Sequence, residues 1–163
     1  MNTIRGLLER EHAALDAHLG AAAPGPTSPV DMSAYGAFRA GLLRHIGMEE
    51  KILLPAARRA RRGEPLERAA QLRRDHAAIA ALLVPTPTRA IVAQLRALLA
   101  AHNILEEGPD GVYAECEALA GAAASELLAR LEAAPAVPPA PHFDGPRAFA
   151  AIDRLLRATG RAL

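Results

Sequence analysis

The chain has 163 residues, a formal net charge of +1 and a single cysteine, Cys116. This length favours one domain with one core, and the small net charge gives no global field that would draw the protein to nucleic acid or to a membrane. One cysteine excludes a disulfide within the chain, which fits a reducing compartment. Hydrophobic residues make up 51% of the chain but aromatic residues only 3%, so the core must consist largely of good helix formers.

The N-terminal residues, MNTIRGLLEREHAAL, carry several charges and contain no continuous apolar run. They therefore lack the features of a signal peptide. No stretch of the chain is long and apolar enough to cross a bilayer. We expect a cytoplasmic protein without membrane contact.

Apolar residues at helical spacing predict a first helix over residues 3–20, with His12 on its apolar face. Three prolines and two glycines predict a loop over residues 20–30. A second helix is expected from Asp31 into the basic segment 58–62, with a kink at Pro55. The arginines of that segment suit the C-terminal end of a helix and are too few for a nucleic-acid surface.

A third and a fourth helix are predicted over residues 65–84 and 87–107, separated by Pro85-Thr86-Pro87. His76 lies on the apolar stripe of the third helix, and His102 and Glu106 lie on that of the fourth. Short connections between amphipathic helices favour antiparallel neighbours. The sequence therefore predicts an all-α protein, an up-and-down four-helix bundle.

The remaining chain predicts additional C-terminal helices. Residues 112–134 carry a further helical pattern, and residues 134–146 are rich in proline and should be extended. A short helix over about residues 147–160 is expected to pack back onto the bundle. We predict a metal-binding helical bundle over residues 1–134, followed by a connector and packing helix over residues 135–163.

Two segments share one pattern, residues 45–50 (HIGMEE) and residues 102–107 (HNILEE). Residues four apart lie one turn above each other on a helix, so each segment offers an imidazole and a carboxylate to the same point. A buried ionised glutamate is costly without a partner or a metal, and imidazole with carboxylate suits Fe, Mn or Zn. We therefore predict a two-metal site, bridged by carboxylates, with the ligands His12, His45, Glu49, His76, His102 and Glu106.

Five further residues do not belong to the six predicted ligands. Glu50 and Glu107 are five residues after their histidines, so they should point away from the metal ions. We interpret them either as solvated, which we favour, or as residues that contact the ligands from outside. Tyr113 follows the break after the fourth helix and could approach the site. Gly41 would permit either a ligand channel or close helix packing, and Cys116 is interpreted as a small packing residue.

The order and spacing of the six predicted ligands resemble the hemerythrin-like (HHE cation-binding) domain family over about residues 1–120. The segments EHAALDAHL, HIGMEEKILLP, RDHAAI and HNILEEGPDGVY are similar to that family as well. The resemblance implies a four-helix bundle with a non-haem di-iron centre, for which an oxo bridge between the two Fe ions is an option. It would make the four histidines terminal ligands, and it would make Glu49 and Glu106 bridging ligands.

Oxygen-carrying hemerythrins have a second histidine one turn after the third-helix ligand, where this chain has Ala80. They also close the fourth helix with an aspartate at a longer spacing, whereas this chain has Glu106 four residues after its histidine. The chain is similar to the branch with four histidines and two glutamates. That branch includes iron–sulfur-cluster repair proteins, nitric-oxide-responsive proteins and iron-sensing domains.

The resemblance implies a protein that binds or senses O2, NO or iron. The alternative is a di-iron enzyme or iron donor acting in NO or peroxide detoxification or in iron–sulfur-cluster repair. We favour the binding function, because the sequence shows no separate polar constellation for a substrate. A third option is a sensor in which residues 134–163 move when the metal state changes. The ligand set itself leaves Mn and Zn open beside Fe.

Overall fold

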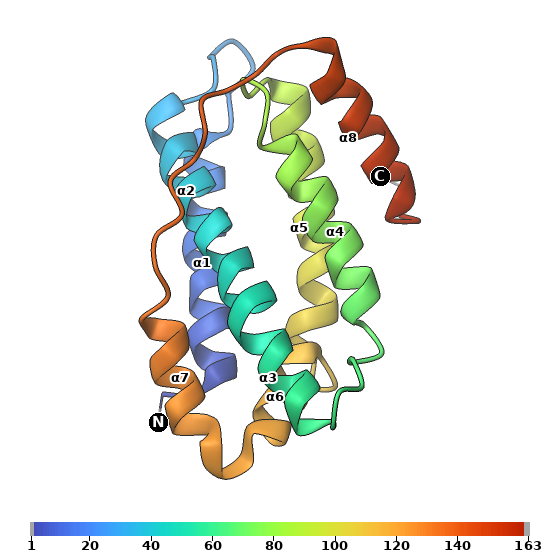
Figure 1. The fold of residues 1–163 in the computed structure, drawn as a ribbon. Helices are drawn as coiled ribbons and strands as arrows, with labels where there is room; N and C mark the ends of the chain where they lie inside the picture. Colours follow the sequence, from blue (N-terminus) through green and yellow to red (C-terminus); the bar gives the residue numbers. More distant parts are fainter. Residues whose placement is uncertain (1, 162–163) are drawn as a thin grey trace.

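The computed structural model describes residues 2–161. Residue 1 and residues 162–163, which the sequence analysis assigned to the bundle and to the C-terminal segment, lie outside the described residues. Within the described range the chain is helical and contains no strand. The four long helices α1 (Ile4–Ala22), α2 (Met32–Met48), α4 (Ala69–Leu82) and α5 (Arg89–Glu107) run up and down alternately (Figure 1). The predicted all-α bundle is confirmed, and none of the described helices is long and apolar enough to span a membrane.

Side-chain oxygens begin three of these helices. Thr3 accepts a hydrogen bond from the backbone N–H of Gly6, and Asp31 accepts one from that of Ala34. The hydroxyl of Thr88 accepts from the backbone N–H of Ile91 in the same way at the start of α5. Each oxygen satisfies a donor that the first helical turn leaves unpaired, which fixes where the helix starts and hence which residues face the core.

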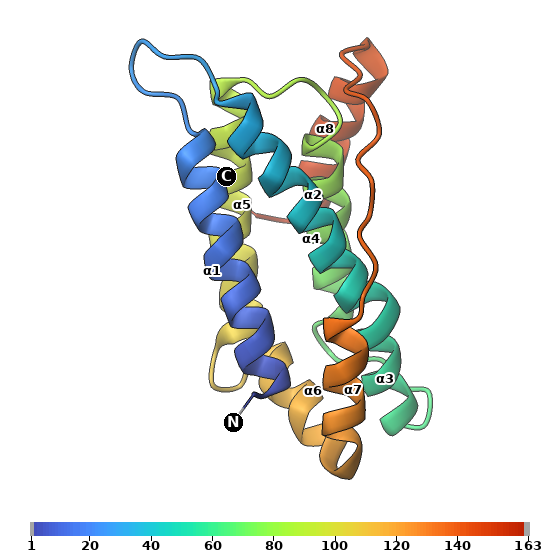
Figure 2. The ribbon, with the colours of Figure 1, turned by 90° about the vertical axis from the view of Figure 1, so that its left-hand side faces the viewer.

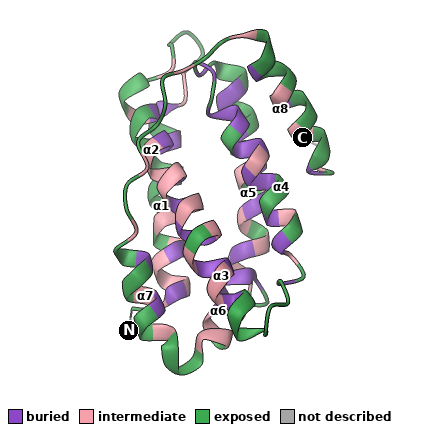
Figure 3. Ribbon diagram, viewed as in Figure 1, coloured by how far each residue is buried: buried purple, intermediate pink, exposed green. Residues whose placement is uncertain are grey.

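The core consists of two apolar layers with a polar layer between them. On α1, Leu8 belongs to one apolar cluster and Leu15 to the other, and His12 lies between them. The same arrangement recurs on the other helices, so that all four inward faces are buried along their length (Figure 3). The layer of histidines is flanked in this way by the pairs Leu42 and Met48 on α2, Leu72 and Ile79 on α4, and Leu98 and Leu105 on α5.

The second predicted helix continues as expected, but its irregularity lies before Pro55. Residues Glu49–Leu53 form a π-helical turn, and α3 (Leu54–Ala60) follows directly. A proline has no N–H to donate, and its ring collides with the carbonyl four residues earlier in an α-helix. A widened turn relieves this collision, and here the turn contains both Glu49 and Glu50.

The predicted helix over residues 112–134 is divided in the structure. It consists of α6 (Val112–Ala120), a short 3-10 turn (Gly121–Ala123) and α7 (Ala124–Glu132). The break occurs at Gly121, whose φ of 49° lies in the left-handed region that favours glycine. The helical pattern expected over residues 112–134 is confirmed, and the structure adds the break at Gly121, which the apolar spacing alone did not locate.

The proline-rich connector is extended and lies along α2 on its way to α8 (Pro146–Ala158), which packs beside α4 (Figures 1 and 2). Arg44 donates to the carbonyl of Ala134 at 3.1 Å, and Arg39 donates to that of Ala140 at 2.8 Å. Asp144 accepts from the backbone N–H of Thr86 at 2.7 Å. The connector is thus fixed to the bundle through its backbone carbonyls and one carboxylate.

Gly111→Ala is expected to destabilise the protein by about 1–3 kcal/mol, as overpacking does in well-packed interiors. A Cβ at this position would lie 2.3 Å from the carbonyl oxygen of Glu106, so the turn after α5 would have to open. The matched control is Gly36→Ala, because a Cβ on this exposed glycine of α2 meets no atom within 4 Å. That variant should gain about 0.5–1 kcal/mol from helix propensity. Urea unfolding of both variants tests the pair, and equal midpoints would contradict the close approach.

Candidate metal centre

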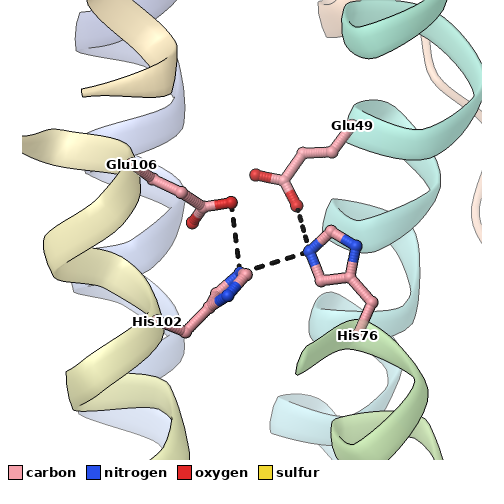
Figure 4. A group of neighbouring side chains, drawn as sticks. All are labelled: Glu49, His76, His102 and Glu106. Atoms are coloured by element: carbon pink, nitrogen blue, oxygen red, sulfur yellow. Dashed lines mark hydrogen bonds and ion pairs between the residues drawn. The ribbon is translucent and has the colours of Figure 1, made fainter. Parts of the chain in front are cut away.

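Six buried side chains from five helical segments meet midway along the bundle. Each is at most 7% exposed. Figure 4 shows four of them, with the two carboxylates facing each other across the gap between the helices. The structure thus brings together all six residues singled out from the sequence: His12 of α1, His45 of α2, Glu49 of the π-helical turn, His76 of α4, and His102 and Glu106 of α5.

The four histidines form two pairs. His12 and His45, the first pair, have ring centroids 4.5 Å apart. His76 and His102, the second pair, have ring centroids 4.8 Å apart and Nε2 atoms 3.2 Å apart. In every case Nε2 is the nitrogen near the carboxylates of the centre. The pairing therefore creates two neighbouring sites, each with two imidazole donors.

Glu49 contacts both pairs through different oxygens. Its Oε1 lies 3.3 Å from Nε2 of His45, in the first pair. Its Oε2 lies 3.1 Å from Nε2 of His76, in the second pair. One carboxylate thus presents one oxygen to each site.

Glu106 repeats this arrangement from the opposite side. Its Oε1 lies 3.1 Å from Nε2 of His102, in the second pair, and its Oε2 lies 3.4 Å from Nε2 of His12, in the first. Both carboxylates therefore have the orientation that a bridge between two cations needs. The sequence predicted the residue types and the shared helix face. Only the structure shows that each carboxylate directs one oxygen to each histidine pair.

Glu50 and Glu107 contact the outer nitrogens of two of these histidines. Glu107 Oε1 lies 2.6 Å from Nδ1 of His12, and Glu50 Oε1 lies 2.7 Å from Nδ1 of His76. The structure therefore favours the alternative interpretation, in which both glutamates contact the ligands from outside, over the solvated one. Each lies on a different helix from its histidine, which spacing along one helix cannot reveal. A carboxylate on Nδ1 orients the ring and keeps Nε2 free to bind a metal.

Asp75 does the same for His102 and was missed by the sequence analysis. Its carboxylate is fully buried and lies 3.1 Å from Nδ1 of His102. It also accepts hydrogen bonds from Gln71 at 2.8 Å and from Arg161, whose Nη2 lies 2.7 Å away. Although burial opposes ionisation, His102 and Arg161 hold the pKa of Asp75 well below its usual value. A residue after α8 thus completes the surroundings of a bundle histidine.

Arg161→Ala is expected to lower the free energy of unfolding by about 1.5–3 kcal/mol, because it removes charged hydrogen bonds from a buried carboxylate. It should also weaken metal binding about tenfold or more, since Asp75 then orients His102 less firmly. The control is Arg154→Ala, because Arg154 is exposed on α8. Urea unfolding and a metal titration of both variants measure the two effects. If the variants behave alike, Arg161 has no influence on the centre.

Without a metal, protonated histidines balance the negative charge of the buried carboxylates. Burial disfavours charged imidazoles, but Glu106 raises the pKa of His102 to about 10, and Glu49 raises that of His76 to about 9. Burial and the nearby His45 lower the pKa of His12. Despite its burial, Glu49 has a pKa well below its usual value because of its histidine neighbours. The centre therefore holds positive charge beside its carboxylates, and metal cations can replace the protons that carry this charge.

Several buried polar atoms of the centre have no hydrogen-bond partner. Glu49 Oε2 and Glu106 Oε1 are both in this state, although an imidazole nitrogen lies 3.1 Å from each. A buried oxygen without a hydrogen-bond partner costs folding free energy. Around a shared metal ion, however, ligand atoms normally lie this close to one another without a hydrogen bond between them. The donor atoms also fall into two groups that lie within 4.8 Å, namely Glu49, His76, His102 and Glu106, and His12, His45 and Glu49. These residues fit metal ions.

Tyr113 and Gly41, whose roles the sequence left open, can now be placed. Tyr113 is fully buried, and its hydroxyl lies within the centre beside the first histidine pair. A Cβ at Gly41 would lie 2.9 Å from Cδ2 of Leu15, so this glycine permits close packing of α2 against α1. The structure therefore supports the packing interpretation of Gly41. It also adds Tyr113 to the residues of the centre.

Comparison with known families agrees with this geometry. The model of the hemerythrin HHE cation binding domain matches residues 3–119, which include all six predicted ligands and Tyr113 but not Arg161. Neither the search of curated proteins nor the search of solved structures found a match. The match covers most of the chain and contains the whole buried centre. The chain therefore belongs to the hemerythrin HHE cation-binding domain family.

Proposed function

We propose that this protein holds a non-haem di-iron centre that binds or senses a small ligand, O2 or NO, or iron itself. One observation carries the proposal: each of two buried carboxylates directs one oxygen to each of two histidine pairs. Such a set suits two ions better than one, because every donor is then used. Family membership supports iron over Mn and Zn, which the donor chemistry also tolerates.

The chain's own residues provide the conditions for such a centre. Glu107, Glu50 and Asp75 orient three of the four imidazoles from outside. The two apolar layers exclude water above and below the centre. When bound, the ions would supply open coordination positions and redox chemistry for a small ligand. The protein would contribute a dry, oriented donor set in the middle of the bundle.

A cavity beside His12 supports access for a small ligand. It has a volume of about 100 Å³ and lies where α1, α2 and α5 meet. This size admits a diatomic molecule and excludes most organic substrates, which need several hundred Å³. Its walls are mainly apolar, with Leu15, Leu19, Leu42 and Leu99 beside Arg96 and Asn103. The cavity therefore has room for a diatomic ligand beside His12.

The test is elemental analysis of protein purified without chelator or affinity tag, combined with optical spectra. We expect about two iron ions per chain, one for each histidine pair, and a near-ultraviolet charge-transfer band. The spectrum should change on reduction with dithionite and change again on exposure to air or NO. No bound metal, together with unchanged stability on iron addition, would overturn the proposal.

The same preparation separates binding from catalysis. A binding or sensing protein should take up its ligand once per centre and then stop. Steady-state consumption of NO or peroxide in the presence of a reductant would instead support the di-iron enzyme that the sequence analysis retained as the alternative. Transfer of iron to an apo iron–sulfur protein would support the iron-donor form of that alternative.

A further inference from the structure

Tyr113 reaches the centre from α6, the helix that follows the tight turn after α5. Its hydroxyl oxygen lies 3.1 Å from Nε2 of His12 and 3.2 Å from Nε2 of His45. It also lies 3.1 Å from Oε2 of Glu106 and 2.5 Å from Oε1 of Glu49. These are the four donor atoms that face the first site, so the phenol converges on the same point as the other donors of that site.

A hydrogen-bonding role does not account for this arrangement. A phenol has one proton to donate and two lone pairs that accept, so it can serve about three partners. Here four atoms surround it, and two of them belong to carboxylates that compete for its single proton. Burial and these carboxylates raise the pKa of Tyr113 well above its usual value. Without a metal, the Tyr113 oxygen therefore has more polar neighbours than it can form hydrogen bonds with.

The same distances are normal for ligands of a common ion. Nitrogen and oxygen donors bind first-row metals such as zinc at about 2.0–2.2 Å, so neighbouring donors at right angles lie roughly 3 Å apart. The four distances from the Tyr113 oxygen run from 2.5 to 3.2 Å. The contacts from Glu49 to His45 and from Glu106 to His12 are 3.3 and 3.4 Å. Five donors thus have the spacing of one coordination shell.

We propose that Tyr113 is a ligand of the metal ion held by the first histidine pair and binds it through its phenolate oxygen. The O–H bond is replaced by an O–metal bond, and the proton leaves to solvent. This inference rests on the proposed metal centre and makes its two ions different. The first ion then has five protein donors and the second has four.

The chain contains an internal control, because its only other tyrosine is Tyr35. Tyr35 is also fully buried, but it belongs to the apolar cluster that contains Phe38, with ring centroids 5.8 Å apart. Its hydroxyl has no hydrogen-bond partner. The two tyrosines therefore share burial and differ in contact with the centre.

The experiment is to load the purified protein with Fe(III) and record visible absorption and resonance Raman spectra. A bound phenolate gives a phenolate-to-iron charge-transfer band in the visible range and enhanced tyrosinate vibrations. We expect both signals in the unmodified protein and in Tyr35→Phe. We expect Tyr113→Phe to lose both signals completely while still binding iron through the remaining donors, which elemental analysis checks.

Iron-loaded protein without the visible band would overturn the assignment of Tyr113 and leave the di-iron proposal intact. Persistence of the band in Tyr113→Phe would do the same. If Tyr113→Phe fails to fold, Tyr35→Phe decides alone, because every tyrosinate signal from that variant must come from Tyr113. Failure of the unmodified protein to bind iron would overturn both proposals together.

Discussion

Glu49→Ala should reduce the bound metal from about two ions per chain to one or none, because the change removes a donor oxygen from each site. Glu50→Ala is the matched control on the adjacent residue of the same π-helical turn. It removes the partner of Nδ1 of His76 and an ion pair with Arg73, but no donor oxygen of either site. It should therefore weaken metal affinity by about 10–100-fold and keep the stoichiometry at saturation. Elemental analysis after gel filtration measures the difference, and circular dichroism checks that both variants are folded.

The comparison has a second, independent arm on α5. Glu106→Ala should resemble Glu49→Ala, and Glu107→Ala should resemble Glu50→Ala, because Glu106 faces both histidine pairs whereas Glu107 contacts only His12 from outside. Equal metal loss in all four variants would show that the carboxylates do not divide into bridging and orienting residues. The assignment of roles at both ends of the centre would then be wrong.

The meeting of the six central residues was predictable because it follows from helical geometry. His45 and Glu49, like His102 and Glu106, are four residues apart and must therefore lie on one face of a regular helix. His12 occupies an apolar stripe whose direction the leucines around it determine. A short-range pattern repeated on several helices was sufficient to bring these side chains into one layer.

The residues that surround the six central side chains were not predictable, because their partners lie far away in the sequence. Tyr113 is 101 residues from His12, and Arg161 is 86 residues from Asp75. Such contacts depend on how α6 and α8 dock, and no periodicity within one helix encodes docking. The π-helical turn at Glu49 adds a local cause, since it rotates Glu50 relative to a regular helix. Glu50 could therefore approach His76, which α-helical spacing did not suggest.

Protonation of the centre links metal binding to stability in a way that depends on pH. The pKa values of His76 and His102 rise from 6.5 to about 9 and about 10 in the folded chain. Raised pKa values stabilise the metal-free fold fully below the unfolded pKa of 6.5, and this contribution is lost as the pH rises through the folded values. The metal-free protein should therefore become less stable as the pH increases from 6.5 towards 9.

Metal binding should have the opposite dependence, because imidazole must lose its proton before it can bind an ion. At a free metal concentration 100 times Kd, binding adds about 2.7 kcal/mol to the free energy of unfolding, which corresponds to roughly 5–10 °C in Tm for a protein of this size. The gap in Tm between metal-loaded and chelator-treated protein should therefore widen from pH 6.5 to about pH 8, measured by circular dichroism. Glu49→Ala should show a smaller gap than the unmodified protein at both pH values. A gap that narrows as the pH rises would mean that protons and metal ions do not compete for these histidines.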